Sequence, residues 1–423
     1  MLHAGGKPPA GPRYTPPMPN AVFVAPFFLD ATVRFIDAAA GLPGVRLALI
    51  SQDSEERLPD SVRQRIAGHY RVNDALSASD IADAVRHISA ALDGVHALVG
   101  MLEQLQEPLG AVRDALGIPG MTESVARNFR DKDRMKDVFD ANGVPCARHG
   151  VVTSADAARR VAADVRLPLV VKPPAGAGAR ATFRIDDASQ LDAWLDVDPP
   201  SPRAPALLEQ LLHGDEHSFD SVVLDGRVAW WSVSRYLPTP LDVLRNPWIQ
   251  WVVVLPRSLD AYGDIREQGE RALQALGLQR GLTHLEWFRL EDGGVAVSEV
   301  AARPPGAQFT SMLSYAHDTD MYADWARLEI LGAFAPPERR YAVGAAYLRG
   351  QGSGVVAAVR GLDVLQHELG DLVVEAHMPK PGQPGAGTYE GEGHVIVRHE
   401  DTAVVERAVR RIVEVARIEL VEA

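Results

Sequence analysis

Two glutamates in the second half of the chain are spaced to share a divalent cation. Glu286 lies in the run THLEWFRL and Glu299 in VAVSEVA, and the turn-forming segment Glu291–Gly294 separates the two runs. This pattern predicts a β-hairpin, whose opposed positions bring two side chains to one face. Two adjacent carboxylates raise each other's pKa unless a cation such as Mg²⁺ lies between them. A solvated hairpin edge is the alternative, but valines flank Glu299, and an unpaired carboxylate is costly there.

A lysine followed by small residues forms a second feature. The run LPLVV leads into Lys172, and Gly176 and Gly178 lie in the AGAGA segment that follows. Small residues let backbone N–H groups approach phosphate oxygens, and the lysine adds positive charge. The lysine precedes the glycines, so the segment is not a P-loop, in which the lysine follows them. We expect a phosphate-binding loop of another kind, with an ordinary glycine-rich turn as the alternative.

The segment ALLEQLL (206–212) is suited to hold an adenine base. Leucines surround Glu209 and Gln210, which gives an apolar slot with a polar rim that ends at Leu212. Glu216 follows closely and could accept hydrogen bonds from ribose hydroxyls. Amphipathic stretches with a glutamate are common, so this segment is informative only together with the others.

The order of these segments resembles the ATP-grasp superfamily, and within it the carboxylate–amine ligases. The matching segments are Arg130-Asp131-Lys132, VVKPPAGAGA, LLEQLLHGDEHSFD and HLEWF…VSEVAARPPG, and the match runs from about 122 to 335. The resemblance implies that ATP is held by Lys132, Lys172, Gly176, Gly178, Glu209, Leu212 and Glu216. It implies that Glu286 and Glu299 bind Mg²⁺, with Mn²⁺ as the alternative, and that Lys172 and Arg303 assist catalysis.

Two positions depart from that pattern. Many relatives have an asparagine two residues after the second glutamate, where this chain has Ala301. One metal ligand would then be replaced by water or by a bidentate Glu299, and a second metal is in doubt. Arg180 stands where a small or hydroxyl residue is common, and it is either an extra phosphate ligand or a surface charge.

Alternating apolar runs and helical stretches predict how these segments are positioned. The expected fold class is α/β and α+β multidomain. The alternation predicts a Rossmann-like N-terminal domain, the resemblance implies ATP-grasp lid and large domains after it, and the C-terminal segment is expected to form a β-rich cap. The expected units are a disordered leader (1–18), the α/β domain (19–121), a connecting helix (122–147), the lid (148–212), the large subdomain (213–335) and the cap (336–423). The α/β domain has no GxGxxG sequence after its first strand, so a dinucleotide site is not expected there.

Composition narrows the class of protein. The 423 residues carry a net charge of −13, which argues against a nucleic-acid or anionic-membrane surface. Cys146 is the single cysteine, and no apolar run approaches the ~20 residues of a membrane-spanning helix. A cytoplasmic enzyme is therefore expected, and a homodimer is left open.

Several side chains have two readings. His284 would share a strand face with Glu286, and a metal or substrate role is the alternative to the hydrogen-bonded core position expected for it. The aromatic-rich stretch comprises Trp230, Trp231, Arg235, Tyr236, Trp248 and Trp251. Core packing is expected for this stretch, and any part that lines a pocket would suit an apolar or aromatic substrate side chain. Arg349 in the C-terminal segment is a further substrate candidate.

The expected reaction joins a small carboxylate to an amine, for example two amino acids, through an acyl phosphate, with release of ADP and phosphate. A bicarbonate-activating enzyme is the first alternative, although no biotinyl-type AMKM segment is present. A non-catalytic nucleotide-binding subunit is the second, supported by Ala301. An oxidoreductase using the N-terminal domain is the third, and the missing glycine fingerprint opposes it.

Overall fold

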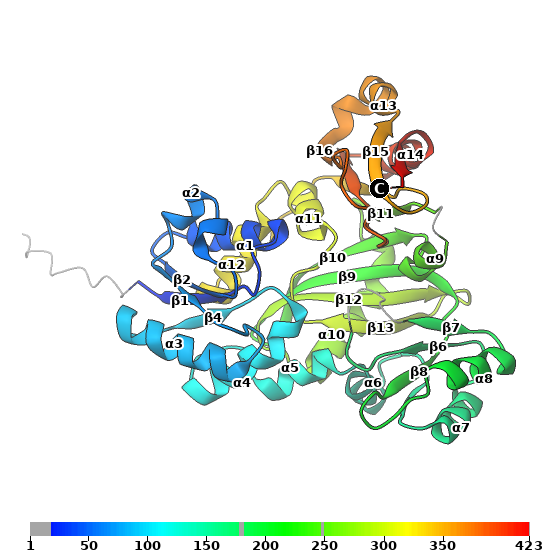
Figure 1. Cartoon of the computed structure of the whole chain (residues 1–423), viewed down its shortest axis with the longest axis horizontal. Coiled ribbons are helices and arrows are strands. Elements are labelled where there is room, and N and C mark those ends of the chain that lie inside the picture. The colour runs from blue at the N-terminus through cyan, green and yellow to red at the C-terminus, as the bar shows by residue number, and fades with distance from the viewer. Residues whose placement is uncertain (1–17, 177–181, 247–248, 423) are drawn as a thin grey trace, which may run out of the picture.

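The computed structural model describes residues 18–422 apart from 177–181 and 247–248, and its strands there form four sheets (Figure 1). The fold is therefore mixed α/β with several sheets, as expected. The expected leader lies outside the described residues except for Met18. No helix in the described ranges combines the length and the apolar character needed to cross a membrane.

The N-terminal sheet is parallel and buried on both faces. Its strands are β1 (Asn20–Val24), β2 (Arg46–Ser51), β3 (Gly68–Arg71) and β4 (Ala97–Val99), in the order β3-β2-β1-β4. Its helices are α1 (Asp30–Ala40), α2 (Asp60–Arg63), α3 (Ala78–Leu92) and α4 (Gln106–Leu116). Alternate residues of β1 enter different cores: Phe23 joins the one with α1, and Val22 joins the one with α3 and α4. The continuous apolar strands suit a sheet covered on both sides.

The connecting segment contains two helices where a single one was expected. These are α5 (Glu123–Arg130) and α6 (Lys132–Ala141). Asp131 between them is extended, and its carboxylate caps α6 by accepting from the N–H groups of Asp133 and Arg134. Lys132 therefore opens a new helix, and its backbone N–H donates to the Pro174 carbonyl at the start of the small-residue loop (3.0 Å).

A small antiparallel sheet follows. Its strands are β5 (His149–Val152), β6 (Leu169–Lys172), β7 (Phe183–Ile185) and β8 (Ala206–Gln210), in the order β5-β8-β6-β7. Helices α7 (Ala155–Val165) and α8 (Ala188–Val197) contribute to its core. The adenine-type segment therefore forms a central strand, β8, beside the strand that ends at Lys172.

The large sheet has the order β13-β12-β9-β10-β11-β14-β17-β16. The strands are β9 (Gly214–Leu224), β10 (Arg227–Leu237), β11 (Trp251–Leu255), β12 (Gly281–Leu290), β13 (Val295–Ala301), β14 (Ala342–Leu348), β16 (Val373–His377) and β17 (Gly393–His399). The hairpin predicted to carry Glu286 and Glu299, β12/β13, is confirmed. The turn residues Asp225-Gly226 between two apolar runs also predict a hairpin, and β9/β10 confirms it. Asp225 and Gly226 both have positive φ (50° and 71°), as the tight turn between twisted antiparallel strands requires.

Helices join this sheet to its surroundings. They are α9 (Pro240–Arg245), α10 (Gly263–Leu276), α11 (Phe309–His317), α12 (Met321–Leu331), α13 (Leu362–Leu369) and α14 (Thr402–Val415). Helix α12 returns to the N-terminal sheet, where Trp325 meets Phe23 and Phe35. Strands β15 (Val355–Arg360) and β18 (Arg417–Val421) form a separate pair near the top of Figure 1. Because β14, β16 and β17 extend the large sheet, residues after 336 are continuous with it, and the expected unit boundaries stay a prediction.

Candidate functional site

Near the cavity, the large sheet has one apolar face and one face that carries polar side chains. Phe219, Leu285 and Trp287 pack into the core that includes residues of α10. Glu286 alternates with Leu285 and Trp287, so it lies on the opposite face. It is the direct register partner of Glu299 on β13, as the hairpin pattern predicted.

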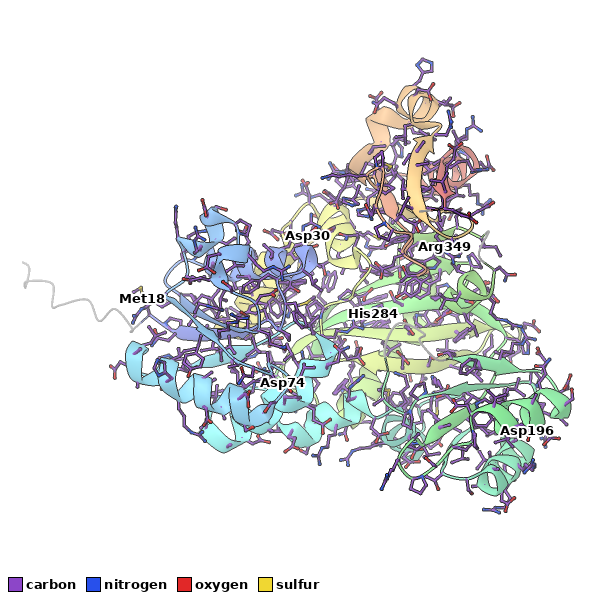
Figure 2. The ribbon with its side chains drawn as sticks, in the orientation of Figure 1. Met18, Asp30, Asp74, Asp196, His284 and Arg349 are labelled. Carbon is purple, nitrogen blue, oxygen red and sulfur yellow. The ribbon has the colours of Figure 1, made fainter. Side chains whose placement is uncertain are left out.

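A cavity of about 340 Å³ is lined by residues of the small sheet, α6 and the large sheet. His284, labelled near the middle of Figure 2, shows where the large sheet contributes to it. The described residues of the predicted site all line this one cavity: Lys132, Lys172, Gly176, Glu209, Leu212, Glu216, Glu286, Glu299 and Arg303. Gly178 and Arg180 lie outside the described residues. The residues selected from the sequence thus share one cavity, and their assignment to a site, with their individual roles, stays a prediction.

Lysines and glutamates alternate along the cavity wall. The Lys132 Nζ lies 2.8 Å from the Glu299 Oε2, and the Lys172 Nζ lies 3.9 Å from the same oxygen. The Lys172 Nζ also lies 2.8 Å from the Glu209 Oε2. Burial alone would raise the pKa of Glu299, but the two lysines outweigh it and lower this pKa to about 2. Glu299 is therefore ionised and holds both lysines beside the cavity.

Lys136 completes this row, and the sequence reasoning did not select it. Its side chain is fully buried, and its Nζ donates to the Ser298 carbonyl (2.8 Å) and lies 3.5 Å from the Glu209 Oε1. Burial lowers the pKa of Lys136, and Glu209 opposes that shift. Its position four residues after Lys132 places both lysines on one face of α6, which is the signal that could have found it.

Carboxyl groups crowd together near Glu286, and a cation would relieve the repulsion between them. The pKa of Glu216 is raised well above its usual value, first by burial and then by Glu286 and Glu299. In the described part of the chain, no group of three or more His, Cys, Asp or Glu is arranged to hold a metal. A pair of carboxylates fits Mg²⁺ nevertheless, because this ion usually takes one or two carboxylates plus waters and nucleotide phosphates.

Arg303 follows the end of β13 and lines the cavity. Its guanidinium donates to Glu103 (3.0 Å from Nη2), and the other Glu103 oxygen lies 2.8 Å from the Arg130 Nη1. Glu103 comes from the N-terminal domain, so a buried carboxylate two hundred residues away in sequence orients this arginine. Ala301 also lines the cavity and is the register partner of His284.

His284 is a hydrogen-bonded residue of the cavity wall. Its Nδ1 lies 2.6 Å from the Asp220 Oδ1, and its Nε2 lies 3.3 Å from the Tyr236 hydroxyl and 3.6 Å from the Glu286 Oε1. Burial alone would lower the pKa of His284, but chiefly Asp220 raises it to about 9. The imidazolium thus links Glu286 to Tyr236 of β10.

Other candidates are divided between the core and the cavity. Trp231 stacks on Phe219, whereas Tyr236 and Trp251 line the cavity, and Trp248 lies outside the described residues. Arg349, labelled in Figure 2, donates to the carbonyls of Val243, Asn246 and Ile249 and is not among the described residues that line the cavity. The expected substrate role of Arg349 is therefore replaced by a structural one.

Known proteins resemble the chain in sequence and in structure, although no family model matches it. An L-arginine-specific L-amino acid ligase of Bacillus subtilis is 26% identical over 212 residues, which are 48% of this chain and 50% of that protein. Alanine–anticapsin ligase of Bacillus subtilis (strain 168) is 26% identical over 240 residues, 51% of this chain and 50% of that protein. The chain thus spans about half the length of these curated relatives.

Solved structures share nearly the whole fold. The L-amino acid ligase of Bacillus licheniformis superposes with a TM-score of 0.75 at 18% identity, covering 96% of this chain and 100% of that one. The ADP complex of an N5-carboxyaminoimidazole ribonucleotide synthetase gives a TM-score of 0.67 at 14% identity, covering 96% and 98%. These structures, at 18% and 14% identity, show that the chain shares their fold over nearly its whole length.

Proposed function

We propose that this protein is an ADP-forming ligase that joins a small carboxylic acid, such as an amino acid, to an amine. A carboxylate oxygen attacks the γ-phosphorus of ATP, the bond from that phosphorus to the β,γ-bridging oxygen breaks, and ADP leaves. The amine nitrogen then attacks the acyl carbon, the bond from that carbon to the phosphate oxygen breaks, and phosphate leaves as the nitrogen loses a proton. The curated relatives named as amino-acid ligases support this class of reaction.

Under this proposal, each side chain of the cavity has a task. Lys132 and Lys172 contact the phosphates, and Glu299 keeps both lysines in place. Glu209, Leu212 and Glu216 contact the adenine and ribose of ATP, and the backbone near Gly176 lies next to the phosphates. The group-transfer step depends mainly on positioning and charge stabilisation, so these residues need no covalent role.

Under the proposal, Glu286, Glu299 and Arg303 lie beside the phosphate that is transferred. Glu286 and Glu299 would hold Mg²⁺, which when bound neutralises developing charge on the phosphates. Arg303, fixed by Glu103, would face the transferred phosphate. The small sheet acts as the lid over the cavity in this proposal, because excluding water protects an acyl phosphate from hydrolysis.

The observation that carries the proposal is the meeting of two lysines, Arg303 and the Glu286/Glu299 pair in one cavity. The test is a screen of amino-acid pairs and small carboxylic acids for ADP and phosphate release, with product masses measured. Amide formation coupled to ADP release is expected. AMP and pyrophosphate as products would contradict the mechanism.

Two other functions stay as competing outcomes of that screen. Bicarbonate-dependent phosphate release without an amine would indicate carboxylase-type chemistry. The structural match to a carboxyaminoimidazole ribonucleotide synthetase is the reason to test for it. Nucleotide binding with no turnover would indicate a non-catalytic subunit. The proposal places the enzyme in the cytoplasm, consistent with the free thiol of Cys146, and sedimentation tests for a homodimer.

A further inference from the structure

One end of the cavity is built from aromatic rings. Tyr236, Trp251, Phe309 and Tyr389 all line it, and they come from β10, β11, α11 and the segment before β17. The ring centroids of Tyr236 and Trp251 are 5.4 Å apart, those of Trp251 and Tyr389 4.9 Å, and those of Tyr236 and Phe309 5.9 Å. All three pairs meet edge to face, so the rings support one another as a continuous wall. We call these four residues the aromatic subsite.

The aromatic subsite adjoins the glutamate pair through one side chain. The Tyr236 hydroxyl lies 3.3 Å from the His284 Nε2, and that nitrogen lies 3.6 Å from the Glu286 Oε1. If the carboxylate of a substrate amino acid lies at the glutamate pair, the side chain of that amino acid can therefore reach the aromatic subsite. The nucleotide-type residues Glu209 and Leu212 belong to the small sheet and the segment that follows it.

The chemistry of the wall selects the kind of side chain it can accept. Tyr236, Trp251 and Phe309 are only 4%, 2% and 2% exposed, so the rings of the wall are packed against the hydrophobic core. An apolar side chain gains free energy by leaving water against such a surface. A charged side chain would lose its hydration, and an anionic one would also approach the Glu286/Glu299 pair.

Resting on the proposed ligase function, we propose that the aromatic subsite binds the side chain of the acid that is activated. The substrate class is then an α-amino acid with a large apolar side chain, such as leucine or phenylalanine. This choice differs from the arginine specificity stated in the name of one relative. Arginine is the sharpest competitor, because a guanidinium also stacks on aromatic faces.

The first test identifies the activated acid directly. Hydroxylamine replaces the amine, so that each activated carboxylate yields a hydroxamate, and leucine, phenylalanine, alanine, glutamate and arginine are compared. We expect kcat/KM for leucine and phenylalanine to exceed that for alanine by about 10- to 200-fold, the range for differences of a methylene or more in an apolar pocket. Equal or higher values for alanine, glutamate or arginine would overturn the aromatic subsite while leaving the ligase function in place.

The second test removes rings from the wall. Tyr389→Ala and Phe309→Ala should raise the KM for leucine about tenfold or more, with the KM for ATP and for alanine nearly unchanged. Tyr389 is only partly buried, so its variant carries the test if Phe309→Ala does not fold. Tyr341→Ala is the control, because this tyrosine lies under Arg398 and is not among the described residues lining the cavity. Equal losses for leucine and alanine would mean a merely structural role.

Failure of the ligase proposal remains distinguishable. If no acid gives a hydroxamate, calorimetry on the protein loaded with Mg²⁺ and a non-hydrolysable ATP analogue measures amino-acid binding alone. Leucine binding at least tenfold tighter than alanine, and weakened in Tyr389→Ala, would sustain the aromatic subsite without the ligase. Absence of that difference would overturn it.

Discussion

Glu299 occupies the position on which most of the candidate site depends. Its carboxylate contacts Lys132 and lies near Lys172, and it opposes Glu286 in the β12/β13 register. The same carboxylate thus orients the cations that suit phosphates and faces the partner with which it would bind Mg²⁺. Glu286 is less engaged by protein cations, since its ion pair is with His284 at 3.6 Å.

Glu286→Gln tests the metal pair with little effect on the fold. Removing one of two carboxylates should lower Mg²⁺-dependent ATP turnover by about 10²–10³-fold, the scale for losing one electrostatic group at a reacting centre. Glu291→Gln, in the exposed turn of the same hairpin, is the control and should retain wild-type turnover. Phosphate release measured against Mg²⁺ concentration checks this, and wild-type turnover in Glu286→Gln would contradict the assignment.

The pH dependence of stability should report the lysine contacts of Glu299. Its pKa in the folded protein is about 2, below the ordinary value of 4.5. The stabilising contribution is therefore fully present above about pH 4.5 and is lost as the pH falls towards 2. Urea unfolding of wild type and Glu299→Gln between pH 3 and 6 measures it. The stability difference should shrink as pH falls, and a constant difference would refute the shift.

Lys136→Met should destabilise the protein, because Lys136 is buried and its contacts cannot be replaced by water. The change leaves the Ser298 carbonyl without its donor and removes one of two lysines near Glu209. A buried group left unsatisfied costs about 1–3 kcal/mol in the free energy of unfolding. Lys380→Met, at an exposed lysine, should change it by less than about 0.5 kcal/mol. Equal urea midpoints for the two variants would argue against this role.

At the scale of elements, two hairpins and one helix break place the reacting groups. The β9/β10 hairpin carries Glu216 and Tyr236, the β12/β13 hairpin carries Glu286 and Glu299, and Asp131 starts the helix that holds Lys132. Each of these three arrangements is formed by neighbouring residues of the chain. Disrupting any one of them would move its lysine or glutamates away from the others in the cavity.

Gly226→Ala probes the first hairpin. Gly226 has φ +71°, where a side chain is strained, and an added Cβ would lie 3.3 Å from the Gln279 side chain. We expect a loss of about 1–2 kcal/mol in the free energy of unfolding. Gly263→Ala is the matched control, with φ −64° and open space around its Cβ, and should be neutral or slightly stabilising. Thermal and urea unfolding compare them, and equal effects would contradict the turn argument.

The same locality explains what the sequence could predict. The turns Asp225-Gly226 and Glu291–Gly294 are set by their own residues, so both hairpins and the Glu286/Glu299 pairing were predicted correctly. The break at Asp131 was missed because helical charge patterning continues across it, while capping by its side chain favours a new helix. Glu103 was missed because its partner Arg303 is distant in sequence. Lys136 was missed because it donates to a backbone carbonyl, that of Ser298, which no side-chain pattern reveals.

At the scale of the whole molecule, long-range strand pairing completes the large sheet. Strand β14 pairs with β11 and β17, so the C-terminal segment shares a sheet with the hairpins of the site. Such pairings follow from no short pattern, so the sequence did not indicate that these strands join the large sheet. The N-terminal domain also takes part, since Glu103 fixes Arg303 and α12 packs against α1. The proposed ligase therefore draws its site from segments spread over most of the chain.

The central claim is that the acid is activated by phosphoryl transfer from ATP to its carboxylate. The most direct measurement uses an acid substrate labelled with ¹⁸O in its carboxylate, with the amine, ATP and Mg²⁺ present. Transfer through an acyl phosphate predicts that the released phosphate carries one ¹⁸O atom and that ADP accompanies it. Unlabelled phosphate, or label found in AMP, would contradict the account.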